Sequence, residues 1–429
     1  MTRLRMVLAL GILSLIGALV TGRDMFYQLA YAIVLVLVLS LFWAWTGVRW
    51  LRFARKTHIR HAQVGQPLEE RLAVRNTGRL PKLWLEVDDQ SNLPGHHAGF
   101  AVSNLAPGGE RGWNVRTTCQ ERGRFTLGPI TVTSGDPFGL FRLSRKVPAT
   151  STIVVYPGTV DLKMFPLPIG YLPGGDALRR RTHYVTTNAA GVREYAPGDG
   201  FNRIHWPSTA KRDRLIVKEF ELDPMADVWV MLDMHRDAHY DAGPFQWRQQ
   251  LLELDRQPPW VRRPKRLDLP PSTEEYAVTA AASIAQYFLR HDRALGLAAV
   301  GQRREVIQAD RGERQLSKIL ETLAVLRAEG RFALQEILAA EAMGLPRGTT
   351  LIIVSSSIDT RWPVVARHLD RSGLNVVAVL IDPEGFGGPP GIAAVSAQFT
   401  VSAIPNYIIR KDDMIEDVLG KAVPLRRAV

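Results

Sequence analysis

The sequence predicts a multidomain protein with an N-terminal transmembrane α-hairpin, an all-β immunoglobulin-like sandwich and an α/β Rossmann-like doubly wound sheet. Three observations predict this order. Residues 1–56 hold two apolar runs, residues 57–150 hold short alternating segments between turn residues, and residues 222–429 alternate apolar strands with helical patterns. Residues 151–221 connect the sandwich to the α/β domain.

The two apolar runs cover residues 6–20 and 25–48 and are separated by a four-residue polar turn. The second run is long enough to cross a bilayer, which takes ~20 residues. The first is shorter, but a tightly paired partner helix can extend it. A cleaved signal peptide is the alternative for the first run. However, residues 19–21 are not a small-x-small cleavage site, and another apolar run follows directly.

The basic residues flank this hairpin and predict its orientation. Arg3 and Arg5 precede it, and five cations follow it: Arg49, Arg52, Arg55, Lys56 and Arg60. The positive-inside rule therefore places both chain ends in the cytoplasm, at the cytoplasmic membrane. Much of the net charge of +12 then belongs to membrane topology. The one cysteine, Cys119, excludes an intramolecular disulfide and fits a reducing compartment.

Strand and helix patterns define the two larger domains. In the β part, alternating segments are expected near residues 68–78, 83–89, 112–119, 123–135 and 140–147. In the α/β part, strands are expected at 227–234, 295–301, 349–357 and 375–382. Helices are expected at 272–292, 311–330 and 363–373, and residues 236–271 form a long excursion after the first strand.

Residues 191–221 hold an unusual mixture of charged and aromatic side chains. The residues that we single out as a binding or structural signature are Arg193, Glu194, Tyr195, Pro197, Gly198, Asp199, Arg203, His205, Trp206 and Lys211. A solvated loop has no need for these aromatic residues, and an apolar core has no need for these charges. The stretch therefore indicates a polar network against a packed surface, which is either a site or a structural clasp.

Three segments resemble the bacterial family named domain of unknown function 58. They are ERGRFTLGPITVTSGDPFGLF at 121–141, IVVYPG at 153–158 and the whole of 191–221. The resemblance covers essentially the whole chain and implies a membrane hairpin, a β-domain and a von Willebrand factor A-like α/β domain. The resemblance also implies that the protein functions together with a MoxR-type AAA+ ATPase and with transglutaminase-like membrane proteins. The family has no established biochemical activity.

The resemblance raises the question of a metal site at Asp233. Von Willebrand A domains commonly bind Mg²⁺ through Asp-x-Ser-x-Ser after the first strand. Here Asp233 is in place, but His235 and Asp237 stand at the two serine positions. Ser355, Ser356, Ser357 and Asp359 follow a later strand and could contribute oxygen ligands. We expect Asp233 to be structural and no cofactor to be bound, with an Mg²⁺-dependent adhesion module as the alternative.

An enzyme is the other alternative for the signature. His205 would be a general base that Asp199 or Glu194 orients. No nucleophile accompanies this group, because Ser208 and Thr209 lie outside any nucleophile-elbow motif. We expect instead a buried clasp at the junction of two domains, with Trp206 as its apolar anchor, and we assign no catalytic residue.

The remaining motifs indicate no further chemistry. Residues 170–175 lack the phosphate-loop pattern, and His96-His97 is an isolated pair in a loop. The short basic clusters are scattered along the chain, which favours a solvated or lipid-facing surface over nucleic-acid binding. The function expected from the sequence is a membrane-anchored cytosolic interaction or adaptor protein.

Overall fold

The computed structural model describes residues 2–57, 61–166, 189–195, 204–220, 227–243 and 269–421. Internal contacts divide the chain into two compact units. The first comprises Met1–Val160, Asp241–Ser283 and Ser317–Arg327. The second comprises Asp161–Tyr240, Ile284–Leu316 and Ala328–Val429.

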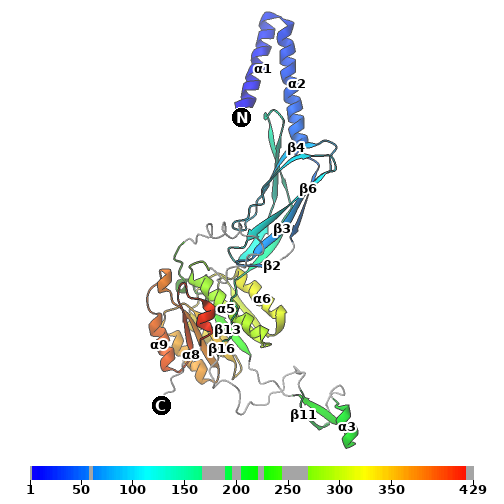
Figure 1. Ribbon diagram of the computed structural model, residues 1–429. Helices are drawn as coiled ribbons and strands as arrows, with labels where there is room; N and C mark the ends of the chain where they lie inside the picture. Colours follow the sequence, from blue (N-terminus) through cyan, green and yellow to red (C-terminus); the bar gives the residue numbers. More distant parts are fainter. Residues whose placement is uncertain are drawn as a thin grey trace. The chain divides into compact units, whose positions relative to one another are not determined.

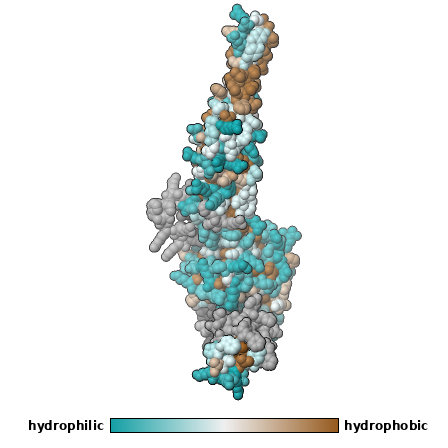
Figure 2. Space-filling view, turned by 90° about the vertical axis from the view of Figure 1, so that its right-hand side faces the viewer, coloured by the Kyte–Doolittle hydropathy of each residue, from teal (hydrophilic) through white to brown (hydrophobic). Residues whose placement is uncertain are grey.

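The first unit begins with a pair of apolar helices, α1 (Thr2–Thr21) and α2 (Asp24–Gly47) (Figure 1). Both are long and apolar enough to cross a membrane. Their side chains are largely exposed, and Figure 2 shows hydrophobic residues on this hairpin. Glycines let the helices approach, because a Cβ on Gly17 would lie only 3.2 Å from the Phe26 ring. The expected pair of apolar helices is therefore present.

Ten strands follow in the first unit. They are β1 (Leu51–Thr57), β2 (His61–Gln63), β3 (Pro67–Asn76), β4 (Lys82–Asp89), β5 (Phe100–Leu105), β6 (Glu110–Thr118), β7 (Gly123–Leu127), β8 (Ile130–Gly135), β9 (Arg142–Val147) and β10 (Ser151–Tyr156). They form sheets of order β1-β3-β6, β2-β10-β7 and β5-β4-β8-β9. The expected β-region is confirmed, and its strands extend on both sides of the 57–150 segment.

Side chains of β4 and β8 attach the helix pair to these strands. The Lys82 ammonium is buried and donates a 2.6 Å hydrogen bond to the Thr46 carbonyl, at the carboxyl end of α2. Burial lowers the pKa of Lys82. A Cβ on Gly47 would lie only 2.7 Å from the Ser134 hydroxyl. The close approach of the end of α2 to β8 therefore favours glycine at this position. A cation at the end of the helix also complements the helix dipole.

Four charged side chains form a buried network between the strands. Arg55, Glu70 and Asp89 lie on β1, β3 and β4, and His96 follows β4. The His96 Nε2 atom lies 2.9 Å from Asp89 and 3.1 Å from Glu70, and Arg55 pairs with both carboxylates. The Thr117 hydroxyl lies 2.9 Å from the other ring nitrogen of His96. We call these four charged residues the tetrad.

The tetrad is electrically balanced when His96 is protonated. Burial alone would lower the pKa of His96, but hydrogen bonds to Asp89 and Glu70 outweigh it and raise this pKa to about 9. Two cations then face two carboxylates. The three ligand-type side chains lie close enough to hold a metal ion. A divalent cation in place of the proton would, however, leave the tetrad with excess positive charge beside Arg55.

A second buried cation, Arg122, precedes β7 and contacts the parts of helices α5 (Thr273–Arg290) and α6 (Gly312–Val325) that belong to the first unit, residues 273–283 and 317–325. Its Nε donates to the Leu323 carbonyl at 3.1 Å and its Nη2 to the Leu326 carbonyl at 2.9 Å. Its guanidinium also pairs with Glu274 and Glu275, in the first turn of α5. We call this arrangement the Arg122 clasp.

The second unit contains a six-stranded mixed sheet of order β15-β14-β13-β16-β17-β18. Its strands are β13 (Val228–Leu232), β14 (Leu295–Val300), β15 (Arg304–Asp310), β16 (Thr350–Ser355), β17 (Asn375–Ile381) and β18 (Asn406–Ile409). β15 pairs antiparallel with β14. The prediction of a wholly parallel sheet was therefore wrong for this strand. The reason is the short 301–303 turn, because parallel neighbours need a longer crossover.

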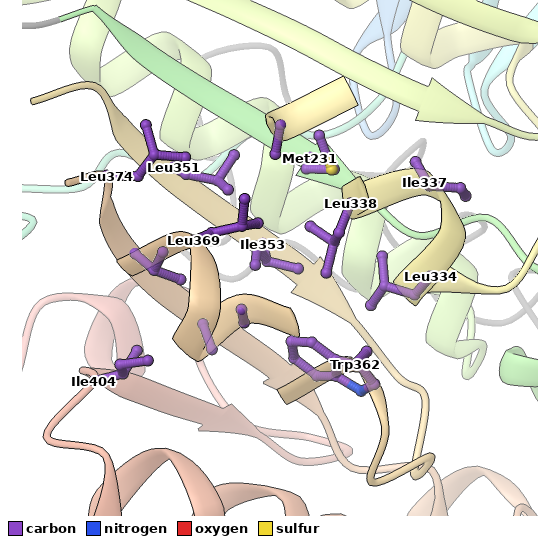
Figure 3. Packing of buried hydrophobic residues seen from close by; sticks show 14 of the residues in the cluster. Met231, Leu334, Ile337, Leu338, Leu351, Ile353, Trp362, Leu369, Leu374 and Ile404 are labelled. Carbon is purple, nitrogen blue, oxygen red and sulfur yellow. The ribbon is translucent and has the colours of Figure 1, made fainter. Parts of the chain in front are cut away.

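Short helices and one apolar core complete this unit. The helices include α7 (Leu334–Ile337), the π-helical η3 (Leu338–Ala342), α8 (Trp362–Arg371), η4 (Glu384–Phe386), α9 (Ile392–Val401) and α10 (Ile415–Leu419). Figure 3 shows Trp362, Leu338 and Ile353 packed together in the core. The Trp362 indole is fully buried. This rigid base positions the loops at the carboxyl ends of β13 and β16.

We expect Arg122→Met to lower the free energy of unfolding by about 3–5 kcal/mol, because the Leu323 and Leu326 carbonyls lose their buried donor and two partly buried glutamates keep only their longer contacts with Arg327. Chemical denaturation of the detergent-solubilised chain measures this loss. Arg124→Met is the matched control: Arg124 also faces α6, but its pair with Glu321 is exposed and spans 3.8 Å. It should cost less than about 1 kcal/mol. Equal costs would show that the Arg122 clasp is not a main stabilising contact.

We expect the tetrad to make stability fall as pH rises through about 9. The folded pKa of His96 lies above its unfolded value of 6.5, so its stabilisation is complete below 6.5 and is lost as pH passes 9. The loss is about 3 kcal/mol. His96→Gln should remove this alkaline dependence, whereas the exposed neighbour substitution His97→Gln should keep it. Denaturation series across this pH range test the prediction, and parallel curves for all three proteins would contradict it.

Candidate functional site

A hollow of about 350 Å³ lies in the second unit, beyond the carboxyl ends of β13 and β16. The chain leaves β13 toward β14 on one side and leaves β16 toward β17 on the other. Open α/β sheets bind ligands at such a reversal of strand order. The polar residues of the lining are Asp233, His235, Asp237, Tyr240, Gln335, Ser356, Ser357, Asp359 and Arg361. We call this the switch-point pocket.

Asp233 lies in the wall of the switch-point pocket, and its side chain is fully buried. One carboxylate oxygen accepts a 2.7 Å hydrogen bond from the Ser355 hydroxyl. The other accepts a 3.0 Å bond from the backbone N–H of His235. The carboxylate therefore closes the loop after β13 against the end of β16.

The serines that follow β16 are also used inside the protein. The Ser355 hydroxyl accepts a 2.9 Å bond from the backbone N–H of Ser357, and the Ser356 hydroxyl donates to the Ala238 carbonyl at 2.5 Å. With Asp233 they join the two loops into one hydrogen-bonded unit. The sequence predicted that these serines could contribute oxygen ligands together with Asp233. The structure brings them close to this carboxylate.

The donor set does not fit the Mg²⁺ site that the resemblance implies. Each oxygen of the buried Asp233 carboxylate already accepts a hydrogen bond from inside the protein, and the Ser356 hydroxyl donates its proton to a carbonyl. The two serines of the Asp-x-Ser-x-Ser pattern are replaced by His235 and Asp237. An octahedral ion with oxygen ligands has no ready-made set of acceptors here.

The mouth of the pocket carries a tight ion pair that the sequence did not single out. Arg361 donates to both carboxylate oxygens of Asp359, with Nε–O distances of 3.0 and 2.9 Å. The hydrogen bonds from Arg361 lower the pKa of Asp359. Arg361 directly precedes Trp362 and Pro363, which begin α8. A Pro at a helix start can be read from the sequence, and it could have predicted that Arg361 lies beside the mouth of the pocket.

The signature forms a small module of two strands and one short helix. Strands β11 (Ala189–Glu194) and β12 (Ile216–Phe220) pair antiparallel, and α3 (Trp206–Arg212) precedes β12. The backbone N–H of Tyr195 donates to the Leu215 carbonyl at 2.9 Å, which extends the hairpin. Four signature residues, Pro197, Gly198, Asp199 and Arg203, lie outside the described residues, and the Arg193 side chain is not described.

The polar signature residues that the structure describes make local contacts. His205 caps α3: its Nδ1 accepts from the Ser208 backbone N–H at 3.3 Å and lies 2.7 Å from the Ser208 hydroxyl. Glu194 accepts a 3.0 Å hydrogen bond from Arg214, and both side chains are exposed. His205 therefore caps α3, and its ring contacts the Ser208 hydroxyl in the first turn of that helix.

Trp206 differs from its expected role as a buried anchor. Its side chain is 65% exposed, and no residue of α3 is buried. The helix is too short to bury a face of its own, and Pro207 fixes its start. Lys211 is exposed in the last turn of α3. The described side chains of Trp206 and Lys211 therefore form an exposed aromatic and basic surface.

The tetrad was not predicted, although the strand patterns contain a signal for it. Buried side chains of β3 occur at every second position from Leu68, and Glu70 is one of them. On β4, Asp89 likewise lies on the same face of the strand as the buried Leu85 and Val87. A carboxylate on the inward side of an alternating strand needs a buried cation.

Comparisons with known proteins agree with the resemblance. Residues 191–254 match the family described as "Protein of unknown function DUF58". The chain is 22% identical over 268 residues to the uncharacterized protein YeaD of Bacillus subtilis, covering 61% of this chain and 57% of that protein. The chain thus spans little more than half the length of this relative.

Solved structures show only slight likeness. The CARDB domain of a Pyrococcus furiosus protein, crystallised with two metal ions, matches 24% of this chain and 91% of its own length. The identity is 19% and the TM-score 0.19. Red sea bream transglutaminase matches 25% of this chain and 15% of its own, with 15% identity and a TM-score of 0.18. The family match and the relative lead to one conclusion: residues 191–254 are similar to the DUF58 family, and the chain is distantly similar to YeaD.

Proposed function

We propose that this protein is a membrane-anchored cytosolic adaptor that docks a partner protein through its DUF58 signature, and that its α/β unit is a von Willebrand factor A-like domain. The observation that supports this proposal is the 65% exposure of Trp206 on a helix that buries none of its own residues. Exposed tryptophans are costly in water and are frequent hot spots of protein interfaces.

The charge around Trp206 indicates the kind of partner. Lys211 and Arg212 lie in the last turn of α3, and both are exposed. An apolar pocket with an acidic rim would complement this surface. A MoxR-type AAA+ ATPase, which the family resemblance implies, is the partner that we propose. The hydrogen bonds of Asp233 favour docking without a metal ion over Mg²⁺-dependent adhesion.

The apolar helices support membrane attachment. α1 and α2 each reach the ~20 residues that a bilayer requires, and their side chains are mostly exposed. Arg3 and Arg49 lie at the end of the hairpin that joins the β-region, whereas its turn holds Arg23 and Asp24. By the positive-inside rule, the β-region and the rest of the chain lie in the cytoplasm.

We expect Trp206→Ala to weaken partner binding by roughly 30-fold, the effect of losing a hot-spot side chain of about 2 kcal/mol. A photo-crosslinking amino acid at the exposed Ala210, one turn after Trp206, should capture a discrete partner in cells, and Trp206→Ala should abolish that product. Met343→Ala is the matched control, because Met343 is 62% exposed on the second unit. Capture that Trp206→Ala leaves unchanged would contradict the proposal.

We expect millimolar Mg²⁺ to leave the melting temperature of the chain unchanged. Asp233→Ala should cost about 2–3 kcal/mol of stability with or without Mg²⁺, because it removes the acceptor of a buried hydroxyl and a buried N–H. Asp237→Ala is the matched control: Asp237 lines the same pocket, but its side chain is 71% exposed. A rise in melting temperature with Mg²⁺ that disappears in Asp233→Ala would instead support a metal-dependent module.

A further inference from the structure

The turn between β8 and β9 carries a large apolar side chain with no apolar cover. Phe138 is 61% exposed at the tip of this turn. The turn is nevertheless firmly built, because the buried Asp136 carboxylate accepts hydrogen bonds from the backbone N–H groups of Phe138 and Phe141, at 2.9 and 2.6 Å. The hydrogen-bonded backbone of the turn thus holds Phe138 at a solvent-facing position.

This turn lies beside the first residues of α1. A Cβ on Gly139 would lie 3.4 Å from the Arg3 guanidinium. Figure 1 shows the β8–β9 turn reaching up to the N-terminal end of α1. Since α1 has 20 residues, it is about 30 Å long, the thickness of the hydrocarbon layer. If the hairpin spans a bilayer, Arg3 marks one edge of that layer, and Phe138 lies at the same edge.

Aromatic rings and cations also surround the end of α2. Trp45 and Trp50 are about half exposed and contact each other edge to face, with ring centroids 5.6 Å apart. The Arg49 guanidinium lies 5.1 Å from the Trp45 ring centroid. Aromatic residues with nearby cations are the usual composition of a protein surface at the headgroup level.

We infer that the Phe138 turn is a membrane-contacting loop, which inserts its phenyl ring among the phospholipid headgroups while Arg3 and Arg49 bind lipid phosphates. This inference rests on the proposed membrane anchorage of the hairpin. The loop gives the β-region a third point of contact with the bilayer besides α1 and α2. It therefore limits how far the β-region can tilt against the membrane plane.

A depth measurement in phosphatidylcholine–phosphatidylglycerol vesicles tests this inference on the full-length chain. Cysteine replaces Phe138, Glu69 or Val34 and carries an environment-sensitive fluorophore. The native Cys119 does not interfere, because it is fully buried, and burial raises its pKa to about 12. Glu69 is the control on β3: its side chain is 69% exposed, and it lies near the end of that strand farthest from α2. Val34 reports the middle of α2.

The label at position 138 should show a blue-shifted emission and about twofold stronger quenching by headgroup-level nitroxide lipids than the label at position 69. The label at position 34 should be quenched by nitroxides deep in the acyl layer. Quenching at 34 with equal, weak quenching at 138 and 69 would overturn the loop inference and leave the anchorage intact. Absence of deep quenching at 34 would overturn the anchorage and the loop inference together.

Discussion

The arrangement of the first unit depends on the need to satisfy the buried guanidinium of Arg122. A charge that is removed from water must regain its hydrogen bonds inside the protein, and the Leu323 and Leu326 carbonyls and two glutamates supply them. Those carbonyls lie at the end of α6, and the glutamates lie in the first turn of α5. Arg122 therefore contacts the negative end of one helix, while its counter-ions lie at the positive end of another.

The two units provide partners for their buried polar groups in different ways. The first unit holds its buried charges in ionic networks: the tetrad is neutral when His96 is protonated, and the Arg122 clasp pairs one buried guanidinium with two partly buried glutamates, which Arg327 also contacts. In the second unit, the buried Asp233 carboxylate is held by a hydroxyl and a backbone N–H, and an apolar core that includes Trp362 covers one face of the sheet. Charge pairs fix direction and distance more strictly than apolar contacts do.

Periodicity in the sequence predicts most strands and helices, because alternation and helical spacing are local. The contacts of Arg122 could not be predicted, since its partners lie 152 to 204 residues away and a charged residue at the start of β7 has no local signature. The partners of Asp233 were partly predictable, because the carboxyl ends of parallel strands meet at one edge of the sheet. The exposure of Trp206 was not predictable, because mixed charge and aromatic content is equally typical of an interface that the chain closes itself.

Because of this ambiguity, the sequence of the signature indicates the family that it resembles but not the role of the segment. The structure shows a buried ionic clasp in the first unit, but it is built by Arg122 in another family-like segment, 121–141. The described part of the signature has instead a capped helix, a short hairpin and an exposed tryptophan. A segment that folds by its own hydrogen bonds while leaving its largest apolar side chain in solvent gains nothing in stability from that side chain. Burial of Trp206 against a partner protein would supply the apolar contacts that the described part of the chain does not give it, which is the physical basis of the proposed docking surface.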